Sequence, residues 1–441
     1  MNNEPADVPV TPPAPPLIAA PPPLVPAAPP VPAPKPSAGK KFLAGLLSVF
    51  LGLIVVNAAV SVLDDSCAIW LDTHLLTGLS GIILCLTVVA AAAVYGLMGL
   101  MPMIPKRIFL PAVLVVIGPF FFVLPVMIYF FRHLMLLDWF LSWAELALGL
   151  LILRWLAGTW KFRWPLVAER HLRDRRFRWG NLLGFVLLNV LVFLPVVAVY
   201  VAVCTSLAVS HFTDGFMALR PGGIILQARK YVRNDGRTVI LFPMSHIAES
   251  DFYRGVARTV TSNSVVLLEG VTDTQNLITN KLTYERAAKK LHLADQHDDF
   301  DLKQGTLVRA DVDVRDFSSN TIAVLNMVAL FHSQGLNART LSLLLQTSSL
   351  DDAQQRQLFD DLLLKRNQHV LNEFFTRLPS SDNFVIPWGA AHMVGLAEEI
   401  QKAGFHLVGT RDYVSIRFGA KKGKADEGDA AWIPPKGASR P

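Results

Sequence analysis

The feature that most constrains this chain is a series of long apolar runs in its N-terminal half. A membrane-spanning helix needs about 20 consecutive, mostly apolar residues. Segments of this length run approximately over residues 42–62, 75–101, 108–131, 134–153 and 182–209. A mean hydropathy of +0.39 and a charged content of only 17% are too apolar for an ordinary soluble chain. The sequence therefore predicts an α-helical transmembrane bundle of about five spans.

The 441-residue chain divides into four segments of different composition. Residues 1–40 are rich in Pro and Ala, which favours a disordered or polyproline-like arm because such a segment cannot bury a core. Residues 41–209 hold the apolar runs, and residues 210–418 have the mixed polarity of a soluble domain. Residues 419–441 are rich in Gly, Lys, Ala and Pro and are predicted to form a disordered tail.

The basic residues that flank the runs predict how they are oriented, since cytoplasmic loops are enriched in Lys and Arg. Lys40 and Lys41 precede the first run, and the strongest basic loop, residues 154–178, follows the fourth. This pattern indicates membrane topology rather than nucleic-acid binding. Five spans then place the soluble domain outside the cytoplasm, on the periplasmic side in a bacterium. Only Arg132 and His133 separate the third and fourth runs, and if these form one re-entrant element the domain lies in the cytoplasm.

In the soluble half, two apolar strands each lead through a short turn into a histidine, and a third ends on a carboxylate. These segments are residues 239–246, 384–392 and 265–269. The first and third are spaced for a helical crossover between neighbouring parallel strands. Because ligands bind at the carboxyl ends of parallel strands, His246, Glu269 and His392 are expected to form an open three-ligand site for a divalent metal such as Zn, Mn or Co. Each histidine also has a structural interpretation, as a hydrogen-bonded residue at a strand end.

Four further side chains have both a functional and a structural interpretation. Glu249, just after the first histidine, is a candidate general base on metal-bound water, or a solvated residue at a helix start. Arg366 lies on a helix with an apolar face, and it either reaches inward to pair with Glu269 or a substrate carboxylate, or is exposed. Asp311 and Asp313 share one strand face by the two-residue period; a solvated face is the default and metal ligation the alternative.

These motifs resemble the TraB/PrgY/Tiki family over residues 230–411. The resemblance is carried by Gly389-Ala-Ala-His392 with Gly395, by Val266-Leu-Leu-Glu269-Gly, by Leu364-Lys-Arg366-Asn367, and by His246 at the place of the family's first Gly-x-x-His. It implies a mixed-sheet α/β fold related to erythromycin-esterase-like and haem-binding ChaN-like proteins, with metal-dependent proteolysis in the Tiki branch. The chain departs from the family in having Pro243 where the first motif has Gly.

The sequence thus favours a membrane-tethered, metal-dependent hydrolase, in the first place a peptidase, acting on a peptide or membrane-protein substrate. The alternative is a non-catalytic regulatory protein, or one that binds a peptide or haem-like ligand. Pro243 motivates this alternative because proline cannot reproduce the backbone freedom of glycine. A transporter is disfavoured because the spans carry few ionisable residues such as Glu145. The sequence predicts no oligomeric state.

Overall fold

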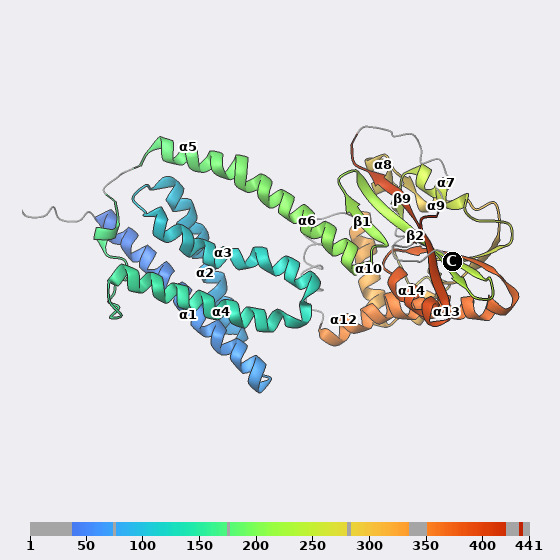
Figure 1. The fold of residues 1–441 in the computed structure, drawn as a ribbon, viewed down its shortest axis with the longest axis horizontal. Coiled ribbons are helices and arrows are strands. Elements are labelled where there is room, and N and C mark those ends of the chain that lie inside the picture. The colour runs from blue at the N-terminus through green and yellow to red at the C-terminus, as the bar shows by residue number, and fades with distance from the viewer. Residues whose placement is uncertain are drawn as a thin grey trace, which may run out of the picture.

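The computed structural model describes residues 38–73, 76–173, 177–279, 284–334, 351–419 and 432–434. Nearly all of the predicted N-terminal arm and most of the predicted tail lie outside these residues. A bundle of long helices is followed by an α/β region, and the two lie end to end (Figure 1).

Five helices in the N-terminal half are long and apolar enough to cross a membrane, the same number as the apolar runs in the sequence. They are α1 (Ala38–Leu71), α2 (Thr77–Leu100), α3 (Lys106–Tyr129), α4 (Leu134–Ala157), and a continuous helix formed by α5 (Trp179–Leu188), the π-helical η3 (Asn189–Phe193) and α6 (Leu194–Phe212). The 3-10 turn η1 (Phe131–His133) separates α3 from α4. Each of these two helices has 24 residues, about 36 Å, so the structure has two separate helices that are each long enough to cross a membrane.

Helix α1 packs against both α2 and α4. Its buried residues Leu47, Leu51 and Ile54 belong to the apolar core of the bundle. Gly149 of α4 allows a close approach, because a Cβ atom there would lie 3.0 Å from Val55 Cγ2. Small residues at this contact therefore help to set the distance between the two helices.

The contact between α1 and α4 also carries a polar seam, formed by Asn57, Asp65, Ser142 and Glu145. The Asn57 amide donates to Glu145 Oε2 at 3.4 Å, and the Ser142 hydroxyl donates to Asp65 Oδ2 at 3.0 Å. Asn57 Oδ1 and Glu145 Oε1 are buried without a hydrogen-bond partner among the described residues. The seam thus places acidic groups inside an otherwise apolar bundle.

The α/β region is built on a seven-stranded mixed sheet of order β1-β2-β3-β8-β5-β7, with β9 also beside β2. The strands are β1 (Met217–Arg220), β2 (Gly223–Arg233), β3 (Thr238–Met244), β5 (Ser264–Leu268), β7 (Thr306–Arg309), β8 (Asn383–Gly389) and β9 (Phe405–Arg417). Strands β3, β8, β5 and β7 are parallel, whereas β2 is antiparallel to its neighbours. The prediction that β3 and β5 are neighbours is wrong, because β8 lies between them.

Helices cover both faces of this sheet. Helix α7 (Ser250–Ala257) packs on one face, and α13 (Lys365–Arg377) and α14 (Met393–Lys402) pack on the other. The other helices of this region are α8 (Glu285–Leu291), α9 (Gln296–Asp299), α10 (Ser319–Gln334), α12 (Asp352–Phe359) and the π-helical η5 (Asp360–Leu364). Its shorter elements are β4 (Ile247–Ala248), β6 (Ala294–Asp295) and the 3-10 turns η4 (Val314–Asp316) and η6 (Leu378–Ser380), whereas the 3-10 turn η2 (Glu169–His171) lies between α4 and α5. In β8, Phe384 and Ile386 join the core with α13 and α14, while Val385 joins the core with α7. This two-residue alternation explains why an almost wholly apolar strand is buried on both faces.

Candidate functional site

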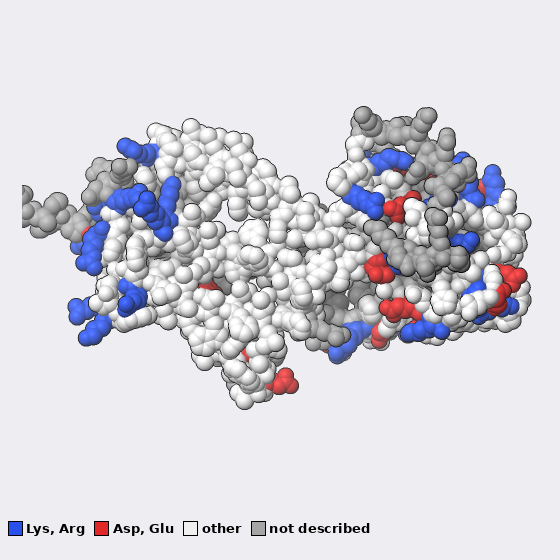
Figure 2. Space-filling view, viewed as in Figure 1, with Lys and Arg blue, Asp and Glu red and all other residues white. Residues whose placement is uncertain are grey.

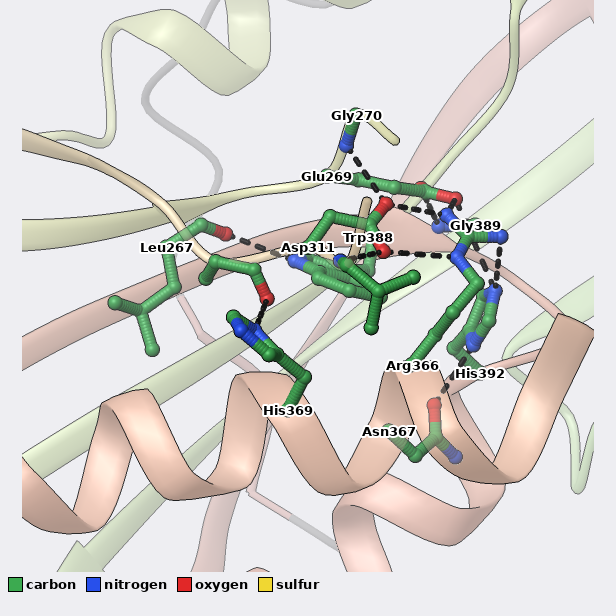
Figure 3. Close-up of polar contacts among 12 residues, drawn as sticks. Leu267, Glu269, Gly270, Asp311, Arg366, Asn367, His369, Trp388, Gly389 and His392 are labelled. Carbon is green, nitrogen blue, oxygen red and sulfur yellow. Dashed lines mark hydrogen bonds and ion pairs between the residues drawn. The ribbon is translucent and has the colours of Figure 1, made fainter. Parts of the chain in front are cut away.

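The carboxyl ends of β8, β5 and β7 lie side by side and bring four charged or titratable side chains together (Figure 3). Glu269 directly follows β5, Asp311 follows β7, and His392 follows β8. Arg366, near the start of α13, reaches into the space between them. These four residues are referred to below as the Arg366 cluster. Of the two orientations expected for Arg366, the structure therefore shows the one in which it reaches inward and pairs with Glu269.

The Arg366 guanidinium is the centre of the cluster. Its Nε and Nη2 donate to the two oxygens of Asp311 at 2.9 and 2.7 Å, and Nη2 also donates to Glu269 Oε1 at 2.7 Å. The side chain of Asp311 is fully buried, and those of Arg366 and Glu269 are 13% and 11% exposed. Burial opposes the charge of the guanidinium, but the hydrogen bonds and charges of Asp311 and Glu269 outweigh it and raise the pKa of Arg366.

Backbone amides at the strand ends fix the two carboxylates. The Gly389 N–H donates to Glu269 Oε2 at 2.6 Å. The N–H groups of Gly270 and Val312 donate to the two oxygens of Asp311, each at 2.9 Å. Because these amides belong to the edge of a packed sheet, the carboxylates are positioned before any ligand arrives.

His392 is held in one tautomer by Asn367, the residue that follows Arg366 on α13. The ring Nδ1 lies 2.7 Å from Asn367 Oδ1. A carbonyl oxygen can only accept, so Nδ1 carries the proton and the lone pair of Nε2 faces Arg366 Nη1 at 3.3 Å. Burial, followed by the charge of Arg366, lowers the pKa of His392 to about 4. The imidazole is therefore neutral at pH 7.

Two further contacts tie the elements around the cluster together. The indole N–H of Trp388 on β8 donates to the Leu267 carbonyl of β5 at 3.0 Å. His369 Nδ1 on α13 lies 3.0 Å from the Ala310 carbonyl, directly before Asp311. The first contact joins β8 to β5, and the second holds α13 against the sheet edge that carries the carboxylates.

The structure places His246 and Glu249 in other surroundings. The His246 ring is exposed and stacks on Tyr284, with ring centroids 4.7 Å apart and planes at 8°. Burial and the charges of Asp295 and Glu269 raise the pKa of Tyr284, so this stack lies within the electrostatic range of the cluster. Glu249 forms an ion pair with Arg417 and accepts its backbone N–H at 2.9 Å. Within the described residues, neither His246 nor Glu249 forms a hydrogen bond or ion pair with the cluster.

The cluster supplies two of the three predicted metal donors. His392 Nε2 and Glu269 Oε1 lie 3.8 Å apart, close to the separation of about 3.4 Å expected for two ligands of one tetrahedral zinc ion. The Arg366 guanidinium contacts both donors, so a metal between them would require its withdrawal. His246 does not join them, and the described residues contain no group of three His, Cys, Asp or Glu side chains that could hold a metal. The metal site stays a prediction.

Asp311 is the cluster residue whose default interpretation was wrong. Strand β7 ends at Arg309, so Asp311 and Asp313 lie in the turn beyond it and do not share a strand face. Asp313 caps η4, accepting the Arg315 N–H at 3.1 Å, and this contact is the main cause that lowers the pKa of Asp313 to about 2. Asp311 follows an apolar strand, as Glu269 follows β5. This position is the sequence feature that could have identified Asp311 as a site residue.

Comparisons of the chain with protein-family models, curated proteins and solved structures find no match. The resemblance to the TraB/PrgY/Tiki family therefore rests on its motif residues. Of these, Glu269, Arg366, Asn367 and His392 lie together at one sheet edge.

Proposed function

We propose that this chain is a membrane-tethered hydrolase that uses the Arg366 cluster to activate water against the peptide bonds of a peptide or membrane-protein substrate. The observation that carries the proposal is the state of His392. A general base needs an unprotonated nitrogen and a fixed orientation, and His392 has a neutral ring that Asn367 holds in place. When substrate binds, Arg366 Nη1, which faces the Nε2 lone pair, turns to the substrate carbonyl and leaves this lone pair to His392 as the base. The position of His392 at the carboxyl edge of a parallel sheet is where ligands bind in folds of this kind.

Each member of the cluster has a distinct role in the proposal. His392 Nε2 takes the proton of the attacking water and returns it to the leaving amine when the C–N bond breaks, while Asn367 holds the tautomer. Arg366 stabilises the negative charge that develops on the carbonyl oxygen. Its Nη1 is suited to this because, within the described residues, it contacts His392 but no carboxylate. Asp311 and Glu269 keep the guanidinium in place through its other two nitrogens.

The charge of the cluster supports the binding of a cation beside it. Two carboxylates face one guanidinium, which leaves one formal negative charge in excess when His392 is neutral. Glu269 and His392 are the residues that would hold the divalent metal implied by the family resemblance. In that state Arg366 would be withdrawn from both donors, and His392 Nε2 would be a ligand instead of the base. A metal bound there would polarise the substrate carbonyl.

We also propose that the chain crosses the membrane five times and presents the α/β domain outside the cytoplasm. The basic residues of the bundle gather at the end opposite to the α/β region (Figure 2). They flank α1, the α2–α3 turn and the α4–α5 segment, and the positive-inside rule assigns this end to the cytoplasm. Fusions of alkaline phosphatase and of green fluorescent protein after Phe418 test this. Phosphatase activity without fluorescence is expected, and the reverse pattern would place the domain inside.

A peptide-library digest by the full chain in nanodiscs, read by mass spectrometry, tests the activity. Replacing His392 by Gln should lower cleavage by about 10²- to 10⁴-fold, and Glu269→Gln should also lower it. His406→Gln is the matched control, because His406 is exposed on β9. Cleavage that survives His392→Gln contradicts the proposed role. Parallel digests with a chelator and with added Zn, Mn or Co show whether a metal is required.

A ligand-binding or regulatory protein is the second candidate function. The observation that favours it is that Asp311 and Glu269 already satisfy two of the three guanidinium nitrogens of Arg366. Peptide retained by the full chain without product formation, and lost in Arg366→Gln, would support this candidate over the hydrolase.

A further inference from the structure

A basic pocket opens at the end of the bundle that lies away from the α/β region. It has a volume of about 880 Å³ and lies between the α2–α3 turn and the segment that leads into α5. Its lining includes Lys106, Arg107, Arg173 and Arg178, and no Asp or Glu is among the described residues that line it. We propose that this pocket binds the phosphodiester headgroup of an anionic phospholipid.

Hydrogen bonds between its two walls hold the pocket open in one shape. The Arg173 N–H donates to the Met103 carbonyl at 3.0 Å. The Asn181 side chain donates to the Met98 carbonyl at 3.2 Å and accepts from Lys106 Nζ at 2.6 Å. The two walls that carry the four cations are therefore joined to each other by hydrogen bonds.

The cations of the pocket have no anionic partner in the part of the chain that the structure describes. Among the described residues, Arg107, Arg173 and Arg178 form no salt bridge, and the hydrogen-bond partner of Lys106 is the neutral Asn181. Four like charges around one cavity repel each other, and a bound anion relieves that repulsion. A phosphodiester with its two free oxygens can accept from several of these groups at once.

The start of α5 adds to the positive potential. Its first turn begins at Trp179 and contains no acidic residue, and Arg178 at the N-cap makes no side-chain capping hydrogen bond. The first N–H groups of a helix have no intrahelical partner, and the helix dipole favours an anion at this end. The helix end is supporting evidence. The inference itself rests on the four cations and the cavity.

The position of the pocket favours a lipid over a soluble phosphate. It lies between the ends of helices long and apolar enough to span a membrane. The rings of Phe177 and Trp179 line it in an edge-to-face pair with centroids 5.1 Å apart, and both side chains are exposed. Aromatic residues of this kind gather at the membrane interface, and Ile104 adds an apolar wall beside them. Basic pockets between spans are suited to lipid headgroups at this depth.

Native mass spectrometry of the full chain tests the inference, with phosphatidylglycerol, phosphatidylcholine or inorganic phosphate added in the same detergent. The double variant Arg173→Gln/Arg178→Gln removes two lining charges. Lys161→Gln/Arg163→Gln removes two charges from the same basic segment but not from the pocket lining, and is the control. We expect the wild type to retain phosphatidylglycerol over phosphatidylcholine, the double variant to bind it at least about tenfold more weakly, and the control to bind it as the wild type does.

Three results would overturn the inference. These are equal retention of the two lipids, an equal loss in the control and the double variant, and phosphate binding that prevents lipid retention at equal concentration. If the double variant does not fold by circular dichroism, the single variant Arg107→Gln replaces it, with an expected loss of phosphatidylglycerol binding of about fivefold.

Discussion

Replacing Arg366 by Met removes the guanidinium while keeping much of the apolar stem of the side chain. The change deletes three charge-assisted hydrogen bonds, of 2.9, 2.7 and 2.7 Å. It leaves the carboxylate of Asp311, whose side chain is fully buried, without a cation. Removing one partner of a buried ion pair costs about 3–5 kcal/mol. Since about 1.4 kcal/mol corresponds to a tenfold change, amide protection at the sheet edge should fall by about 10²- to 10⁴-fold.

Hydrogen exchange by mass spectrometry on the full chain measures this loss in peptides that cover β5 and β8. Arg315→Met is the matched control, because the Arg315 side chain is 59% exposed and lies 3.9 Å from Asp313. A surface pair of this kind contributes about 0–1 kcal/mol, so its protection should stay close to that of the wild type. Equal protection in Arg366→Met and Arg315→Met would refute the buried network.

Three other outcomes follow from the structure. The lowered pKa of His392, about 4 against an ordinary value near 6.5, means that the unfolded chain binds a proton that the folded chain does not. Stability should therefore fall by about 3 kcal/mol as the pH drops from 6.5 to 4, and His392→Gln should flatten this part of the pH dependence of thermal melts. Asn367→Ala should lower hydrolysis and change the tautomer of His392 in nitrogen NMR spectra, whereas Asn372→Ala, in a more C-terminal turn of α13, should change neither. Glu145→Gln keeps a partner for Asn57 and removes a carboxylate from the bundle, so it should raise the melting temperature in detergent by a few degrees, roughly 2–4 °C per kcal/mol.

The parts of the fold that sequence predicted are those that local patterns determine. The length of each apolar run predicts a long helix, because a helix that crosses a membrane needs about 20 consecutive, mostly apolar residues. The β2–β3 hairpin turns at Asn234-Asp235-Gly236, a local sequence that favours such a turn, and Gly236 has a positive φ of +88°. Glu269 and His392 could be placed at one edge because each follows an apolar strand.

The parts that sequence missed depend on contacts between distant segments. Strand β8 lies between β3 and β5 although it follows them by more than 100 residues, and no local pattern reports that order. Asp311 and Arg366 are 55 residues apart in the sequence. The sequence around either residue alone therefore does not show that the two form a buried ion pair. His246 follows a strand as His392 does, yet its ring stacks on Tyr284 of a later segment. Only the assembled sheet edge distinguishes the two histidines.

Digestion of a peptide substrate in water enriched in oxygen-18 tests the central claim most directly. We expect the full chain to incorporate one labelled oxygen into each new carboxyl terminus. His392→Gln and Glu269→Gln should abolish this incorporation, and His406→Gln should preserve it. Product formed without the label, or label incorporated equally by His392→Gln, would contradict the assignment of the Arg366 cluster as the site that activates water.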